Sequence, residues 1–212
     1  MKLYTFFRSS ASFRVRIALN LKGIAWESVA VNLPKGEHVE PKFKAINPQG
    51  LVPALDDGGK LLSQSLAIME YLDETCPGAK LLPGGPADRA YVRAFSQLIA
   101  CEIHPLNNVR VLKYIKRTYK LDDESVNGWY RHWIAEGFAS MEAFLLNERR
   151  HGRHVFGDHA TMADCCLVPQ VFNAQRYECD LNPYPTVMKI FEECMKLDAF
   201  IAAQPMKQPD AA

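Results

Sequence analysis

The chain has 212 residues, of which 48% are hydrophobic and 23% are charged, with 25 Lys and Arg against 24 Asp and Glu. This composition is typical of a globular protein, and a formal net charge of +1 gives no reason to expect nucleic acid or an anionic membrane as a partner. No apolar run approaches the ~20 residues that cross a bilayer, and the first residues read as a strand rather than a signal peptide. We therefore expect a cytoplasmic protein.

The first 80 residues alternate strand and helix patterns. A strand over residues 3–7 is followed by an amphipathic helix that ends at Gly23, and a second strand over residues 26–33 completes a βαβ unit with parallel pairing. A short helix over 40–46, a hairpin over 51–62 and a helix that begins at Gln64 and Ser65 follow. This order predicts a thioredoxin-like α/β domain with a mixed sheet over residues 1–80.

Strand patterns disappear after the segment Leu81-Leu-Pro-Gly-Gly-Pro86, which marks a domain boundary. The remaining residues, 87–212, are predicted to form an all-α helical domain. Its longest helix should span residues 87–119 and bend at Pro105, because proline removes a backbone donor. Further helices are expected over 127–147, after a capping box that begins at Thr161, and over 186–196 and 198–203, followed by a frayed tail.

The cysteines and histidines give no metal signature. The six cysteines form no Cys-x-x-Cys pair and have no zinc-ligand spacing, which indicates buried free thiols. His151, His154 and His159 lie in a turn-rich polar stretch without a carboxylate or cysteine at ligand spacing. We expect a solvated loop there and no metal site.

Three polar corners of the first domain point to one edge of its sheet. Ser9 and Ser10 begin a helix, where unpaired N–H groups and the helix dipole favour an anion or a thiolate, although Ser10 taken alone is more simply a cap. Pro53 lies in a short strand, so an edge, a bulge or a cis bond there would leave backbone groups of Val52 for another partner. The third corner is the helix start after the hairpin.

A thioredoxin-like layer without a Cys-x-x-Cys pair has no dithiol of its own, so any reactive thiol must arrive as a ligand. A peptide-like thiol could pair its backbone at Val52, place a carboxylate at the helix start by Ser65 and hold its sulfur near Ser9. Glutathione fits this description.

Five motifs make the chain resemble the zeta-class glutathione transferases, the family that includes maleylacetoacetate and maleylpyruvate isomerases. They are Arg8-Ser-Ser-x-Ser-x-Arg-Val-Arg-Ile-Ala-Leu19, Asn47-Pro-x-x-x-Val-Pro53, Gln64-Ser-Leu-Ala-Ile68, Thr161-Met-Ala-Asp164 with Leu167-Val-Pro-Gln-Val171, and Asp180-Leu-x-Pro-Tyr-Pro185. Where many members have cysteine, this chain has Ala11, which leaves a mechanism based on serine intact.

The resemblance implies a set of site residues. Ser9 would stabilise the glutathione thiolate, with Ser10 and Arg176 as further catalytic residues, and the bond before Pro53 would be cis. The implied glutathione contacts are Ser9, Ser10, His38, Val52, Pro53, Gln64, Ser65 and Asn108. The implied substrate contacts are Arg8, His104, Asn108, Arg110 and Arg176.

The implied activity is glutathione-dependent cis–trans isomerisation of a maleyl-keto acid, with maleylacetoacetate ahead of maleylpyruvate, by reversible addition of the thiolate. Such substrates are small dianions, and cations placed apart would hold their two carboxylates. Two alternatives remain open: a transferase that conjugates or dehalogenates small α-halo acids, and a non-catalytic binding module of the same fold. The family also implies a homodimer.

Overall fold

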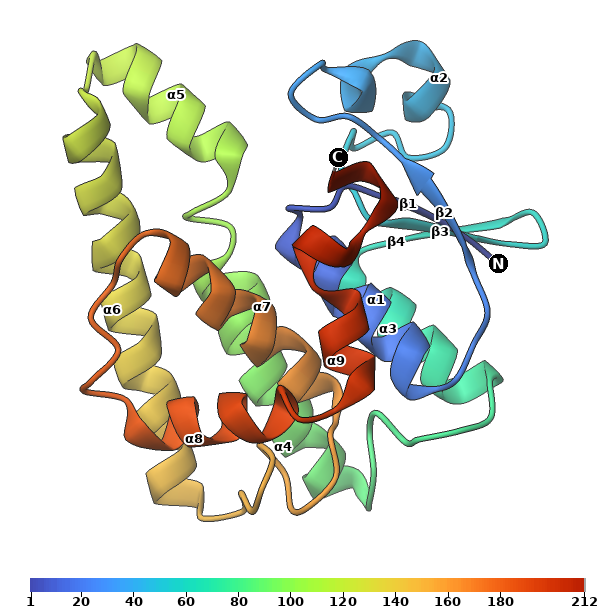
Figure 1. The fold of residues 1–212 in the computed structure, drawn as a ribbon, viewed down its shortest axis with the longest axis vertical. Coiled ribbons are helices and arrows are strands. Elements are labelled where there is room, and N and C mark those ends of the chain that lie inside the picture. Colours follow the sequence, from blue (N-terminus) through green and yellow to red (C-terminus); the bar gives the residue numbers. More distant parts are fainter. Residues whose placement is uncertain (212) are drawn as a thin grey trace. The chain divides into compact units, whose positions relative to one another are not determined.

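A computed structural model describes residues 1–211, which form two compact units (Figure 1). The first unit consists of Met1–Pro83 together with the segment that begins at Met195, and the second unit is Gly84–Cys194. No helix within residues 1–211 has both the length and the apolar character needed to cross a membrane.

The first unit is built on a four-stranded mixed sheet. Its elements are β1 (Lys2–Thr5), α1 (Ser10–Leu21), β2 (Glu27–Ala30), the 3-10 turn Glu37–Val39, α2 (Pro41–Lys44), β3 (Ala54–Asp57), β4 (Lys60–Ser63) and α3 (Ser65–Thr75). The strand order is β2-β1-β3-β4, with β1 parallel to β2 and antiparallel to β3. The predicted thioredoxin-like layer is therefore confirmed, and its strands are shorter than the alternating patterns suggested.

The register of the sheet decides where the connecting loops meet. Tyr4 on β1 lies opposite Ala54 on β3, and Ala54 lies opposite Ser63 on β4. The end of β1, the start of β3 and the end of β4 therefore share one edge of the sheet. The loops that enter α1 and α3 leave from this edge.

The C-terminal segment packs on the first unit, which differs from its predicted place in a helical domain over 87–212. Helix α9 (Asp198–Ala203) lies beside α1, as Figure 1 also shows. Asn20 donates from Nδ2 to the Ala199 carbonyl at 3.0 Å, and Asp210 accepts the Phe7 N–H through Oδ2 at 2.9 Å. The tail is thus ordered into 3-10 turns rather than frayed, because it supplies polar partners to α1 and to the loop before it.

The second unit is all-helical. It contains α4 (Pro86–Gln97), a π-helical segment (Leu98–Ile103), α5 (Val109–Tyr119), α6 (Asp123–Glu148), α7 (Met162–Arg176) and α8 (Pro185–Cys194). The π-helical segment approaches α6 closely, since a Cβ added to Gly137 would lie 2.2 Å from the Ile103 side chain. A side chain at position 137 would therefore require the Ile103 side chain to move.

The single bent helix predicted over residues 87–119 is wrong. The helix ends after the π-helical segment, residues 104–107 form a turn, and α5 begins as a new helix. Pro105 supplies no backbone donor, and Asn108 then accepts the Arg110 N–H through Oδ1 at 3.1 Å, which caps the new helix.

All six cysteines are free thiols, but the prediction that they are buried is only partly correct. Cys165, Cys166 and Cys194 are buried, whereas Cys76 and Cys179 are half-buried and Cys101 is exposed. Cys101 lies in the π-helical segment, whose turn is wider than the 3.6-residue turn of an α-helix.

Candidate functional site

Ser9 occupies the N-cap of α1. Its Oγ accepts the Ser12 N–H at 3.2 Å, and its own N–H donates to the Phe6 carbonyl at 2.9 Å. Because the oxygen already accepts a backbone donor, the hydroxyl hydrogen can point to a ligand. Ser9 is half-buried and Ser10 is buried, so Ser9 is the more accessible hydroxyl at the positive end of the helix.

The loop that leads to Ser9 is held by the buried Arg16. Its Nη1 donates to Thr5 Oγ1 at 3.1 Å and to the Phe6 carbonyl at 3.4 Å, and its Nη2 donates to the Phe7 carbonyl at 3.1 Å. Burial lowers the pKa of Arg16, and the negative charge of Asp210 opposes this shift. The conformation of the loop before Ser9 therefore depends on hydrogen bonds from the Arg16 guanidinium, which belongs to α1.

Arg8 lies in the same loop and is exposed. Its guanidinium carbon lies 5.1 Å from the centre of the Phe7 ring. A cation over an aromatic face is favourable at this range. Arg8 thus places a positive charge directly before Ser9 in the chain.

The Val52–Pro53 corner has the cis peptide bond that the resemblance implied. The ladder with β1 begins at Ala54, so the backbone of Val52 lies outside it. The loop before Val52 is braced by the buried Asn47, whose Nδ2 donates to the Leu51 carbonyl at 2.7 Å.

His38 lies on the 3-10 turn beside this loop. Gly50 has a φ of +63°, and a Cβ added there would lie 2.8 Å from the His38 carbonyl oxygen. The two backbones therefore approach too closely for any residue but glycine, which brings the turn that carries His38 next to the Val52 corner.

The start of α3, at Gln64 and Ser65, is hydrogen-bonded both to the loop before Val52 and to helix α1. Gln64 has a φ of +69°, which is uncommon for a residue other than glycine, and its Nε2 donates to Gln49 Oε1 at 2.8 Å. Ser65, the first residue of α3, is buried and its Oγ accepts from Nη1 of Arg14 at 3.3 Å. The loop before Val52 and helix α1 are thus both tied to the start of α3.

The predicted glutathione contacts of the first unit therefore come together at one edge of the sheet. The sequence did not predict that Arg14, Asn47 and Gln49 also bond at this edge. Arg14 lies within an apolar stretch of α1, and a buried guanidinium requires a partner. That requirement is the signal in the sequence that points to Arg14.

The predicted substrate residues belong mostly to the second unit. His104 is half-buried at the end of the π-helical segment, Asn108 caps α5, and Arg110 is exposed in the first turn of α5. Asn107, between them, donates from Nδ2 to the Tyr130 carbonyl on α6 at 3.2 Å.

Arg176, at the end of α7, is exposed and lies 5.0 Å from the centre of the Tyr177 ring. That ring stacks on Tyr130 with centroids 3.6 Å apart. Burial raises the pKa of Tyr130, and the positive charge of Arg176 lowers it in part. The loop that carries His104 and Asn108 and the end of α7 are therefore both attached to the same turn of α6.

Residues 1–74 match the family model "Glutathione S-transferase, N-terminal domain". The matched stretch contains all four strands of the sheet, most of α3, the cis proline before β3 and the serine at the N-cap of α1. The fold and this edge of the sheet define a glutathione transferase.

Full-length relatives give the family. The maleylpyruvate isomerase of a Ralstonia species is 50% identical over 212 residues, which is 100% of both chains. A holo structure of maleylpyruvate isomerase, described as a bacterial zeta-class glutathione transferase, has a TM-score of 0.97 and 50% identity over 100% of both chains. The maleylacetoacetate isomerase of Methylobacterium extorquens AM1, with bound malonate and glutathione, has a TM-score of 0.97 and 45% identity over 100% of both chains. The chain belongs to this family of zeta-class glutathione transferases.

Proposed function

We propose that the chain is a glutathione-dependent cis–trans isomerase that converts a maleyl-keto acid to its fumaryl isomer. One observation carries the proposal: Ser9 accepts a backbone N–H at the start of α1 and can still donate its hydroxyl hydrogen. The proposal agrees with the isomerase activities named for relatives that match along their full length.

The first unit would hold glutathione at the edge where its three corners meet. The Ser9 hydroxyl would donate to the sulfur, and the N-terminal end of α1 would add positive potential, so that the thiol pKa falls. The backbone of Val52 would pair with the peptide, while Gln64 and Ser65 would receive the γ-glutamyl end at the start of α3. His38, on the neighbouring turn, completes the proposed contacts. Ser10 is buried in the first helical turn and would contribute its backbone N–H.

Bound glutathione would supply a thiolate that adds reversibly to the alkene carbon, so that rotation about the resulting single bond is possible and the cofactor is recovered. The chain's own residues would hold the substrate during that rotation. Arg176, Arg8 and Arg110 are cations that could pair with its two carboxylates. His104 and the amide of Asn108 would add donors, although Asn108 Oδ1 is engaged at the helix cap.

The test is to supply purified chain with glutathione and either maleylacetoacetate or maleylpyruvate. We expect the fumaryl isomer to accumulate while the glutathione concentration stays constant, with the rates on the two acids giving the preferred substrate. Stoichiometric loss of glutathione would favour conjugation or dehalogenation instead. Absence of glutathione binding in calorimetry would overturn the proposal in favour of a non-catalytic module.

We infer a homodimer and a cytoplasmic location from family membership and from the sequence. Light scattering coupled to size-exclusion chromatography should give twice the chain mass of 23.9 kDa. A mass equal to one chain would contradict the inference.

A further inference from the structure

Three side chains from separate segments of the second unit meet in its interior. His154 lies in the loop between α6 and α7, Asp164 in the first turn of α7, and Cys194 at the end of α8, and their exposed fractions are 5%, 0% and 0%. The prediction of a solvated loop without a cysteine or carboxylate partner is therefore wrong for His154. Cys194 lies 40 residues further along the chain, so local spacing could not reveal it.

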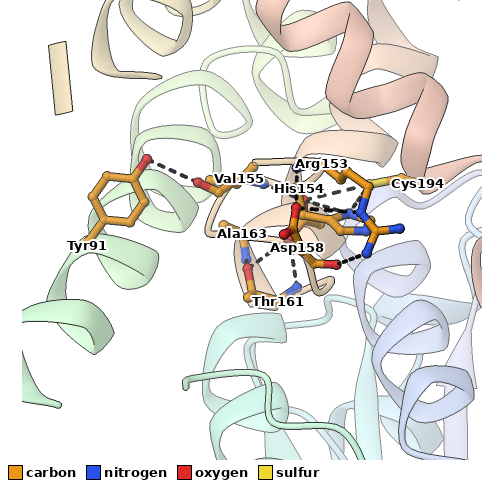
Figure 2. Close-up of polar contacts among 9 residues, drawn as sticks. Tyr91, Arg153, His154, Val155, Asp158, Thr161, Ala163 and Cys194 are labelled. Carbon is orange, nitrogen blue, oxygen red and sulfur yellow. Dashed lines mark hydrogen bonds and ion pairs between the residues drawn. The ribbon is translucent and has the colours of Figure 1, made fainter. Parts of the chain in front are cut away.

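The three ligand atoms form a nearly regular triangle. Nδ1 of His154 lies 3.4 Å from Sγ of Cys194 and 3.6 Å from Oδ1 of Asp164, and that oxygen lies 3.7 Å from the sulfur. Figure 2 shows His154 and Cys194 among the polar contacts of this region. Each residue therefore contributes a single atom to the triangle: Nδ1 of His154, Oδ1 of Asp164 and Sγ of Cys194.

Hydrogen bonds fix the carboxylate in place. Asp164 Oδ2 accepts the N–H and the hydroxyl of Thr161 at 2.7 and 2.9 Å, and Oδ1 accepts the Val155 N–H at 2.9 Å. These bonds include the predicted capping box of α7, which the structure confirms. The backbone of His154 is bonded on both sides, to the Gly157 carbonyl and from the Gly152 N–H. The triangle is therefore preorganised by its surroundings.

We propose that His154, Asp164 and Cys194 form a buried site for one divalent cation, for which Zn²⁺ is the best match. The centre of such a triangle lies about 2.1 Å from each atom, within the range of Zn–N and Zn–O bonds and about 0.2 Å short of a Zn–S bond. A set of one nitrogen, one oxygen and one sulfur ligand suits zinc better than magnesium or calcium, which prefer oxygen alone.

Charge also favours the ion. A thiolate, a carboxylate and a neutral imidazole around Zn²⁺ carry no net charge, which reduces the cost of burial. Zinc would displace the thiol proton, which passes to solvent, and would bind the Nδ1 lone pair of His154, whose ring proton then lies on Nε2. No atom would be oxidised or reduced. The Val155 N–H would remain on Asp164 Oδ1, as an outer-shell donor to a metal ligand.

The metal-free alternative is a relay of hydrogen bonds. In it, Nδ1–H of His154 donates to Sγ of Cys194, and the S–H donates to Asp164 Oδ1. Burial and then the negative charge of Asp164 raise the pKa of the Cys194 thiol, so that without a cation the thiol stays protonated. The two states differ in whether the sulfur is bonded to a metal, which spectroscopy detects directly.

The ligand atoms are enclosed, so we expect the cation to enter during folding, as α8 docks against α7. The full chain should therefore be produced in medium that contains Co²⁺, which takes the same ligands as Zn²⁺ and absorbs visible light. We expect about one cobalt per chain and a near-ultraviolet band from charge transfer between thiolate and cobalt. The absence of both in the wild-type chain would overturn the proposal.

Two cysteine variants form a matched pair. Cys194→Ala removes the sulfur ligand and should lower the metal content at least tenfold and abolish the charge-transfer band. Cys165→Ala removes another fully buried thiol of the second unit and should retain both. Equal metal content in the two variants would show that the cobalt binds elsewhere. If Cys194→Ala does not fold, the wild-type band still decides between metal and relay.

Discussion

Individual residues at the edge of the sheet where α1 and α3 begin combine a structural role with a proposed functional one. Ser9 caps α1 through its oxygen, and the same hydroxyl is the proposed donor to the thiolate. Ser65 begins α3 and accepts a hydrogen bond from Arg14. A change at either serine therefore alters both the helix start and the ligand contact, and experiments have to separate the two effects.

Arg14→Lys should weaken glutathione binding through Ser65. Lysine retains the positive charge but lacks the planar fork that reaches Ser65 Oγ, and loss of a buried hydrogen bond costs about 1–3 kcal/mol. We expect a lower free energy of unfolding and a KM for glutathione that rises more than kcat falls. Arg117→Lys, on exposed helix α5, is the control and should change neither.

The local sequence pattern was sufficient to predict which residues lie at the ends of helices and strands. Ser9, Pro53 and Gln64 lie where a strand or helix begins or ends, and turn or capping chemistry marks such positions. Arg14 and Asn47 were not assigned to the site because their partners are distant or lie in an irregular loop. Arg14, for example, is 51 residues from Ser65.

Helices and strands position these residues through register and capping. The alignment of Tyr4, Ala54 and Ser63 brings the three corners to one edge, which the β-α-β-α-β-β-α order anticipated. The break after Ile103 was not anticipated. A proline in a helical pattern predicts that the helix either kinks or ends there. In this chain the helix ends, because a π-helical segment precedes Pro105 and Asn108 caps a new helix after it.

Glu142→Gln should destabilise the second unit by weakening the start of α8. The buried carboxylate of Glu142 accepts the backbone N–H groups of Thr186 and Val187 at 3.0 and 2.9 Å. Glutamine offers one oxygen and would turn an NH₂ group towards the other donor. We expect a loss of about 1–3 kcal/mol in urea unfolding.

Glu136→Gln is the matched control for Glu142, because Glu136 lies on the same helix and is exposed. Its unfolding midpoint should remain within error of the parent. An equal effect of both substitutions would show that the charge on α6, rather than the cap of α8, accounts for the change.

In the whole chain, the C-terminal segment is a structural part of the first unit, which is proposed to bind glutathione. It covers α1 through α9 and supplies a carboxylate to the loop that leads to Ser9. The sequence predicted the bounds of α9 but not the unit to which it belongs, since two residues 203 positions apart in the chain carry no local signal of their contact.

Asp210→Ala should therefore affect the glutathione site despite its position near the C-terminus. Loss of the acceptor leaves the Phe7 N–H without its partner, so we expect lower thermal stability and a severalfold higher KM for glutathione. Asp123→Ala removes an exposed carboxylate that pairs with Lys116, and such pairs contribute about 0–1 kcal/mol. This control should keep the parental KM, and an equal rise in both variants would contradict the role of Asp210.

We propose that the Ser9 hydroxyl keeps the sulfur of bound glutathione ionised. Titration of the ultraviolet absorbance of the bound thiolate measures this effect in the parent, in Ser9→Ala and in Ser9→Thr, which retains the hydroxyl and the cap. We predict a bound thiol pKa well below that of free glutathione in the parent and in Ser9→Thr, and a value at least one unit higher in Ser9→Ala, equivalent to about 1.4 kcal/mol. An unchanged pKa in Ser9→Ala, with glutathione still bound, would contradict the claim.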